Sequence, residues 1–196
     1  LKYSGTCDMA DAKVVSGEMS YSGSNSVKIT IKPMPPEYID IGAFCARYIR
    51  DPSVVKEGGV YEFGASYYVP SGNGVPIVFL NMDDHRGTIG NFYEFRMINA
   101  QIKTETGEVT VLRSKKEGYE PIGKVDFQYD TWFKLWIRYD GKTAVVGYES
   151  PKEQRTFNVD WLSVVGDLYY ADLWGFNFYV GGNNFYTDGG SKVVYV

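Results

Sequence analysis

Hydrophobic and polar residues alternate most clearly in residues 132–139, WFKLWIRY. One face would carry only apolar or aromatic side chains, and the other would alternate tryptophan with a cation. The first face comprises Phe133, Leu135, Ile137 and Tyr139, and the second Trp132, Lys134, Trp136 and Arg138. Because successive side chains of a strand point to opposite faces, this predicts a half-buried strand with the first set in the core. The following Asp140-Gly141 pair favours a tight hairpin into an antiparallel strand at 143–149.

Short segments rich in β-branched and aromatic residues recur along the chain, separated by turns rich in Gly, Pro or Asn. We predict strands at 26–31, 44–49, 60–69, 76–81, 92–98, 109–113, 132–139, 143–149, 173–180 and 192–196. No segment shows a sustained period of 3.6 residues, so little or no helix is expected. The pattern predicts an all-β fold, a two-sheet antiparallel β-sandwich. A chain of 196 residues is within the usual size of one such domain, so we expect residues 1–196 to form one domain.

The closing segment 192–196 is apolar on both faces. Val194 and Val196 share one face, and Val193 and Tyr195 share the other, so both faces should be covered. We predict that this strand pairs within the chain, with 12–15 or 26–31. The alternative is that a terminal strand completes the sheet of a neighbouring copy.

Composition and charge exclude two classes of partner. The net charge is −4 and the cations are dispersed, so the basic surface that nucleic acid requires is absent. No apolar run approaches the ~20 residues of a membrane span. The first residue is Leu1 rather than Met, as after removal of a secretion signal, so we expect a secreted, extracellular protein.

The only cysteines are Cys7 and Cys45, without a CxxC motif. In an oxidising compartment we expect them to form a disulfide. Two buried free thiols are the alternative.

Four segments, in this order, resemble the concanavalin A-like lectin/glucanase superfamily, especially its laminin-G-like and polysaccharide-lyase-like branches. They are AKVVSGEMSYSGSNSVKI (12–29), GGVYEFGASYYVPSG (58–72), DTWFKLWIRYDGKTAVVGY (130–148) and the closing LWGFNFYVGG with GGSKVVYV (173–196). The closing segment lacks the acidic dipeptide that often follows in relatives. The resemblance implies a jelly roll of two curved sheets, a concave face that commonly holds a carbohydrate, and often a structural calcium. It does not determine function, because this fold hosts hydrolases, lyases, lectins and structural modules.

Catalytic signatures are weak. Glycosidases need paired carboxylates, whereas Glu62, Glu94 and Glu149 each stand alone on their strands. A polysaccharide lyase needs a base and a cation that neutralises the uronate. For that alternative the candidates are His85, Arg86, Tyr93 and Arg96, although the motifs of recognised lyases are not reproduced.

Binding chemistry is better represented, because the 17 Tyr, 11 Phe and 4 Trp exceed what one core can absorb. Exposed aromatic rings with amide neighbours can bind sugar rings, and they also occur at protein interfaces. The predicted ligand-binding residues are Trp132, Trp136, Trp174, Tyr170, Asn183 and Tyr186. Loop carboxylates are suitable calcium ligands. The candidates for a structural Ca²⁺ are Asp8, Asp11, Asp83, Asp84 and Asp188.

We therefore expect a non-catalytic carbohydrate-binding module whose partner is a polysaccharide or a cell-surface glycan. One alternative is a structural subunit that assembles with copies of itself into an extracellular filament, tube or surface layer. A polysaccharide lyase is the enzymatic alternative.

Overall fold

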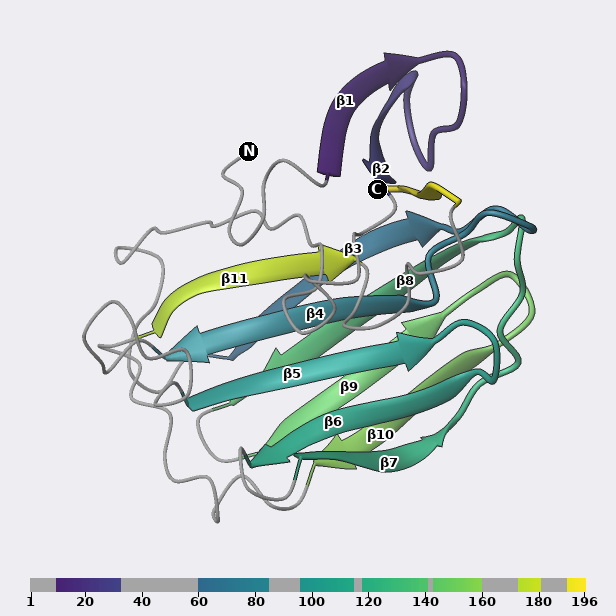
Figure 1. Cartoon of the computed structure of the whole chain (residues 1–196). Helices are drawn as coiled ribbons and strands as arrows, with labels where there is room; N and C mark the ends of the chain where they lie inside the picture. The colour runs from purple at the N-terminus through teal and green to yellow at the C-terminus, as the bar shows by residue number, and fades with distance from the viewer. Residues whose placement is uncertain are drawn as a thin grey trace.

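The computed structural model describes residues 10–32, 60–84, 96–114, 118–140, 143–159, 173–180 and 190–196. All regular elements within these ranges are strands, and they form two antiparallel sheets packed face to face (Figure 1). The larger sheet has the order β1 (Ala10–Ser16), β2 (Asn25–Ile31), β12 (Lys192–Tyr195), β3 (Tyr61–Tyr68), β8 (Trp132–Tyr139), β9 (Ala144–Glu149) and β10 (Gln154–Val159). The smaller sheet has the order β11 (Leu173–Val180), β4 (Ile77–Asp84), β5 (Arg96–Lys103), β6 (Glu108–Ser114) and β7 (Gly118–Lys124). The predicted two-sheet β-sandwich is confirmed.

The core lies between the two sheets and is built by alternate residues of each strand. On β8, Phe133, Leu135 and Ile137 are buried, Lys134 is half-buried and Arg138 is exposed. The facing strands β4 and β5 bury apolar side chains at the same period. The predicted orientation of β8 is therefore confirmed, and its pairing with β9 confirms the predicted hairpin.

The closing strand β12 lies inside the larger sheet. It pairs with β2 over Lys192–Tyr195 and reaches β3 through Tyr195 opposite Tyr68. Val194 is fully buried between the sheets. The prediction that this strand pairs within the chain is confirmed, and 26–31 rather than 12–15 is the partner.

Three strands are missing from the predicted set, and one predicted strand is displaced. The missing strands are β1, β7 and β10, and each lies at an edge of its sheet; residues 12–15 of β1 were named only as a possible partner of the closing segment. The segment predicted at 92–98 overlaps β5 only from Arg96, and β5 continues to Lys103. The strand predicted at 44–49 lies outside the described residues.

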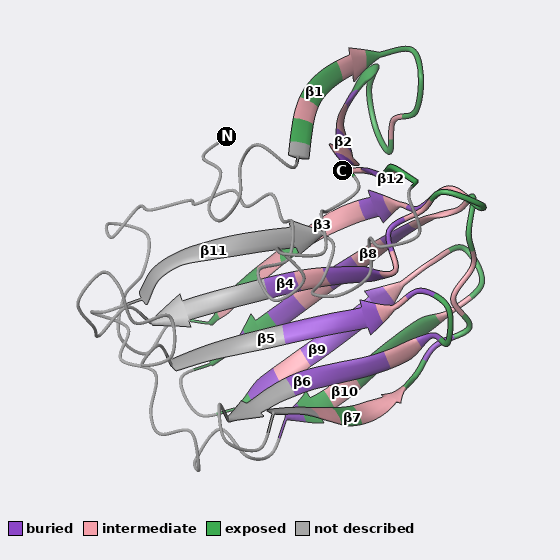
Figure 2. Cartoon of the chain, in the orientation of Figure 1, coloured by how far each residue is buried: buried purple, intermediate pink, exposed green. Residues whose placement is uncertain are grey.

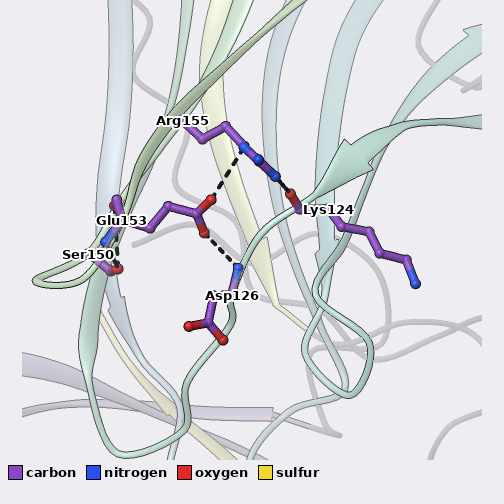
Figure 3. A network of polar contacts seen from close by, with 5 residues as sticks. All are labelled: Lys124, Asp126, Ser150, Glu153 and Arg155. Atoms are coloured by element: carbon purple, nitrogen blue, oxygen red, sulfur yellow. Dashed lines mark hydrogen bonds and ion pairs between the residues drawn. The ribbon is translucent and has the colours of Figure 1, made fainter.

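A polar network joins the edges of the two sheets at β7 and β10 (Figure 3). The Glu153 carboxylate accepts a hydrogen bond from the Asp126 amide at 2.6 Å and forms an ion pair with Arg155. Arg155 in turn donates to the Lys124 carbonyl. On the same two strands, Phe157 lies so close to Gly123 that a Cβ at position 123 would be 2.3 Å from the ring. The missing side chain at position 123 therefore permits the close approach of the two edges.

The β1–β2 hairpin extends beyond the smaller sheet (Figure 1). Its residues are mostly exposed or half-buried, in contrast with the buried centres of β5, β6 and β9 (Figure 2). The described residues contain no helix long and apolar enough to span a membrane.

Candidate functional site

Four aromatic side chains form a continuous row, here called the aromatic row: Tyr21, Trp132, Tyr68 and Tyr195. The backbone register aligns three of them, because Trp132 is opposite Tyr68 and Tyr68 is opposite Tyr195. Their chain neighbours Phe133, Tyr67 and Val194 are buried in the core. Since strand side chains alternate, the row lies on the outward face of the larger sheet. Tyr21 extends it from the turn between β1 and β2.

The rings of the aromatic row touch one another at angles. The centroid distances are 5.8 Å from Tyr21 to Trp132, 5.7 Å from Trp132 to Tyr68, and 6.0 Å from Tyr68 to Tyr195. Such tilted and edge-on contacts are the favoured geometry of aromatic pairs. Tyr21 is 60% exposed, and the other three rings are half-buried. The row thus presents a connected aromatic surface to solvent.

One end of the row carries opposite charges. Lys28 is 3.1 Å from the Glu18 carboxylate, to which the Tyr195 hydroxyl donates at 3.3 Å. The Lys28 ammonium also lies 5.5 Å from the centre of the Tyr195 ring, within the range of a cation–π contact. Its hydrogen bond to Glu18 raises the pKa of Lys28, so the ammonium stays charged.

A fixed carboxylate lies beside Tyr68, within the row. Asp130 adopts a left-handed backbone conformation with φ of 57°. One of its oxygens accepts hydrogen bonds from the Ser71 amide at 3.0 Å and the Tyr68 hydroxyl at 3.4 Å. The hydrogen bonds from Ser71, and then that from Tyr68, lower the pKa of Asp130. Burial, followed by the nearby Asp130 charge, raises the pKa of Tyr68, so the phenol remains a donor.

Trp136 lies on the same outward face but in a different setting. Its indole N–H donates to Glu149 at 2.8 Å, and its ring covers the backbone of Gly147. A Cβ at position 147 would be 1.9 Å from the ring, so the ring rests on β9 only because residue 147 is glycine. Beside it, Lys134 forms an ion pair with Glu62 at 3.3 Å. Trp136 is therefore anchored to the sheet, whereas Trp132 belongs to the aromatic row.

The predicted ligand-binding residues do not all share one surface. Trp132 and Trp136 lie on the larger sheet, whereas Trp174 lies on β11, at the edge of the smaller one, where the ladder is irregular between Leu173 and Gly175. The remaining predictions fall outside the described residues; they are Tyr170, Asn183 and Tyr186.

The structure describes only some of the residues predicted to bind a metal or to form a disulfide. Asp11 forms an ion pair with Lys32 at 3.7 Å, and Asp83 and Asp84 end β4. In the described ranges, no group of three or more His, Cys, Asp or Glu could hold a metal ion. The other residues concerned lie outside the described ranges; they are Asp8, Asp188, Cys7 and Cys45. Structural calcium and the disulfide remain predictions.

The lyase candidates belong to the hairpin of β4 and β5. Asp84 is opposite Arg96 in the register, so the segment 85–95 starts and ends at the same end of the smaller sheet. His85, Arg86 and Tyr93 belong to this segment and lie outside the described residues.

Amide residues of the smaller sheet are opposite one another in the backbone register. Asn81 pairs with Asn99 on one side and with Asn177 on the other. On β5 and β6, Gln101 is opposite Thr110, and these side chains are 4% and 1% exposed. The Thr110 hydroxyl is buried and has no hydrogen-bond partner among the described residues. Only the strand register reveals this polar row, because its members are far apart in sequence.

Sequence reasoning missed several residues of the aromatic row and its ends. Tyr21 and Glu18 lie in the β1–β2 turn, where no alternation marks them, and Lys28 lies within β2 but was not assigned to a site. Alternation correctly placed Tyr195 on the other face of the strand from Val194, but Tyr195 was not assigned to a site. Tyr68 was signalled by the Tyr67-Tyr68 pair, of which only one ring can enter the core, and Tyr67 is the buried one.

No family model matches this chain, and no curated protein is significantly similar to it. Solved structures are similar in fold. The exoplasmic/lumenal domain of VIP36, in a form bound to Ca²⁺ and Man3GlcNAc, has a TM-score of 0.53 at 10% identity, covering 96% of this chain and 81% of that one.

Two further structures have TM-scores of 0.52 at 10% identity. The endo-β-1,4-glucuronan lyase of the fungus Trichoderma reesei matches over 95% of this chain and 84% of its own. Arcelin-5, a lectin-like defence protein of Phaseolus vulgaris, matches over 97% and 91%. At 10% identity, the structural similarity to these three proteins shows a common fold and nothing more. The chain shares the two-sheet β-sandwich fold of these three proteins.

Proposed function

We propose that this chain is a non-catalytic carbohydrate-binding module that binds a polysaccharide or cell-surface glycan along the aromatic row. The observation that carries the proposal is the continuity of Tyr21, Trp132, Tyr68 and Tyr195 on one solvent-facing surface. Sugar rings have apolar faces that pack on aromatic rings, and their hydroxyls hydrogen-bond to polar groups at the margins.

Polar groups are held in fixed positions beside Tyr68 and at the Tyr195 end of the row. Asp130 is held by Ser71 and Tyr68, and Glu18 by Lys28 and Tyr195. The two carboxylates can accept hydrogen bonds from sugar hydroxyls, and the Lys28 ammonium can donate hydrogen bonds to sugar oxygens. Because these groups are already oriented, little side-chain ordering would be needed on binding.

Two of the structures with this fold support a glycan over a protein as the partner. The VIP36 domain was determined with Man3GlcNAc, and arcelin-5 is described as lectin-like. Secretion and a structural Ca²⁺, expected from the sequence, fit such a module.

Replacing Trp132 by Ala should abolish most of the binding, because Trp132 is the only ring that contacts both Tyr21 and Tyr68 among the described residues. We expect the affinity to fall by about tenfold or more, since ring contacts alone supply about 0.5–1.5 kcal/mol beyond the buried area. A panel of polysaccharides and a glycan array identify the ligand, and calorimetry then measures the affinity of the variant.

The matched control is Tyr129→Ala. Tyr129 is an exposed aromatic residue outside the row, in contact with Phe127 and Thr104. This variant should bind the glycan as the unaltered protein does, and thermal melting should show that both variants are folded. Equal affinity of Trp132→Ala and the unaltered protein, or silence across the whole panel, would contradict the proposal.

A polysaccharide lyase is the second candidate. It is favoured by the β4–β5 register, which sets Arg96 at the same end of the sheet as the segment that begins at His85. The glucuronan lyase of the same fold adds support. Arg96 would neutralise a uronate and His85 would remove the proton next to it.

We expect His85→Ala to leave the function intact. If the protein only binds a glycan along the aromatic row, His85 does no chemistry, and its removal should leave the glycan affinity unchanged. The assay is the ultraviolet absorbance of uronic-acid polymers, in which a lyase creates an unsaturated, absorbing product. Absorbance that rises with the unaltered protein and stays flat with His85→Ala would make the lyase the correct function.

A further inference from the structure

The turn between β3 and β4 contains an asparagine followed by a glycine, Asn73-Gly74, the only such pair in the chain. Asn73 is exposed. Among the described residues, none forms a hydrogen bond with the Asn73 side chain, and none accepts one from the Gly74 amide. Asparagine is a chemically labile residue, because the next backbone nitrogen can attack its side-chain carbonyl. Both reacting groups of this pair are therefore free.

The backbone around the pair is held in place on both sides. The Asn73 amide closes a γ-turn around Gly72, whose φ is 81°. The Asn73 carbonyl accepts from the Val193 amide at 2.8 Å, and the Val193 carbonyl accepts from the Val75 amide at 3.2 Å. These two bonds attach β12 to the turn. They lie before and after Gly74 and leave its nitrogen outside the ladder.

Gly74 cannot carry a side chain in this turn. A Cβ at position 74 would overlap the Val69 side chain and the Pro70 carbonyl. A side chain on the residue that follows an asparagine shields the backbone nitrogen from the asparagine side chain, and glycine provides no such shield. The fold thus requires, at position 74, the residue that leaves the nitrogen most open.

We propose that Asn73 is a site of spontaneous modification, at which the folded protein converts asparagine to aspartate and isoaspartate with water as the co-reactant. The Gly74 nitrogen loses its proton and bonds to the side-chain carbonyl carbon of Asn73. The bond from that carbon to the side-chain nitrogen breaks, and ammonia leaves with the proton. Water then opens the resulting succinimide ring at either carbonyl. One opening gives aspartate, and the other gives isoaspartate, in which the main chain runs through the former side chain.

Three asparagines of the smaller sheet lack this arrangement. Asn81, Asn99 and Asn177 lie within β4, β5 and β11, where the backbone register pairs Asn81 with each of the other two. Each is followed by a residue with a side chain, and the ladder holds the backbone of each extended. They serve as internal references for Asn73 in the same sample.

Isoaspartate at position 73 would disturb the attachment of β12. It inserts one carbon atom into the main chain between Asn73 and Gly74. The bonds that join Asn73 and Val75 to Val193 then cannot both keep their geometry, because the backbone between them is longer. Aspartate leaves the main chain, and both bonds, unchanged. The two products therefore differ in their effect on β12.

Incubation of the folded protein at neutral and mildly alkaline pH tests the modification. Peptide mapping by mass spectrometry measures deamidation at each asparagine, and isoaspartate methyltransferase labels the isomerised product. We expect conversion at Asn73, faster at the higher pH because the attacking nitrogen must lose its proton. The three strand asparagines should stay intact.

Two controls accompany the incubation. A synthetic peptide of residues 69–76 gives the rate without the fold. Asn73→Gln, whose longer side chain would have to close a larger ring, should stay unconverted in the same period. An intact Asn73 in the folded protein after the peptide has converted, or equal conversion of the strand asparagines, would overturn the proposal.

Melting and hydrogen exchange test the effect on β12, with freshly prepared Asn73→Asp as the matched control. The isoaspartate form should melt roughly 2–12 °C lower than the unaltered protein, the effect of two lost hydrogen bonds in a domain of this size. Its Val193 amide should exchange about fivefold faster or more. Asn73→Asp should match the unaltered protein in both measurements. An isoaspartate form that behaves as Asn73→Asp does would overturn the inferred loosening of β12.

Discussion

Deletion of residues 192–196 is expected to unfold the protein. The segment contains β12, which bonds β2 to the rest of the larger sheet. Val196 and Val27 exchange two backbone hydrogen bonds at 2.8 and 2.9 Å. Val193 donates to the Asn73 carbonyl at 2.8 Å and accepts from the Val75 amide at 3.2 Å. Without β12, β1 and β2 lose the strand that connects them to β3.

The lost burial is large compared with the total stability. Val193 and Val194 are both buried, and each such side chain stabilises by about 1.5–3 kcal/mol. Domains of this kind are stable by about 5–15 kcal/mol in total. Exposing the edges of β2 and β3 adds unpaired ladder groups and a risk of aggregation. We therefore expect loss of the cooperative melting transition and of soluble protein.

The control for this deletion is Tyr195→Ser, which keeps β12 and its buried valines and removes only a ring of the aromatic row. This variant should melt cooperatively and bind glycan weakly. Circular dichroism and gel filtration compare it with the truncated protein. A truncated product that is soluble, folded and monomeric would show that β12 is dispensable and that our assignment of its role is wrong.

Leu135→Ala should lower the stability by about 2–5 kcal/mol, the usual cost of a cavity in a well-packed core. Leu135 is fully buried at the centre of β8, between Ala65 of β3 and Tyr148 of β9 in the register. In a domain of this size each kcal/mol lowers the Tm by roughly 2–4 °C. Chemical unfolding and thermal melting measure the change.

Arg138→Ala is the matched control on the same strand. Arg138 is exposed on the opposite face, so its loss should change the stability by no more than about 0.5 kcal/mol. Equal melting temperatures for Leu135→Ala and the unaltered protein would refute the packing of β8, and a large loss for Arg138→Ala would mean that the faces are reversed.

The sequence by itself determined the strands that have one face in the core and the other in water. On β8 the alternation assigns each residue to the core or to the surface, because a one-residue shift would place Leu135 in water. The Asp140-Gly141 turn likewise determined a local pairing. The order of four motifs indicated the jelly roll.

The strands β7 and β10 illustrate where alternation carries too little information. Strand β7 contains Pro121, which central strands exclude but an edge strand tolerates. On β10, Gln154–Val159, most residues are polar and only Val159 is buried. The sequence of β10 therefore shows no hydrophobic alternation. Edge strands bury little surface, and their hydrophobic pattern is correspondingly weak.

The candidate site was determined mainly by the tertiary structure. The sequence marked Trp132 and Trp136 as outward-facing, but it gave no reason to join Trp132 to Tyr21, Tyr68 and Tyr195. Those residues come from distant parts of the chain, and the register of β8, β3 and β12 aligns them. Pairing between strands is non-local, so the spatial order of the sheet, and with it the neighbours of each outward side chain, is fixed only when the two layers pack around a common core.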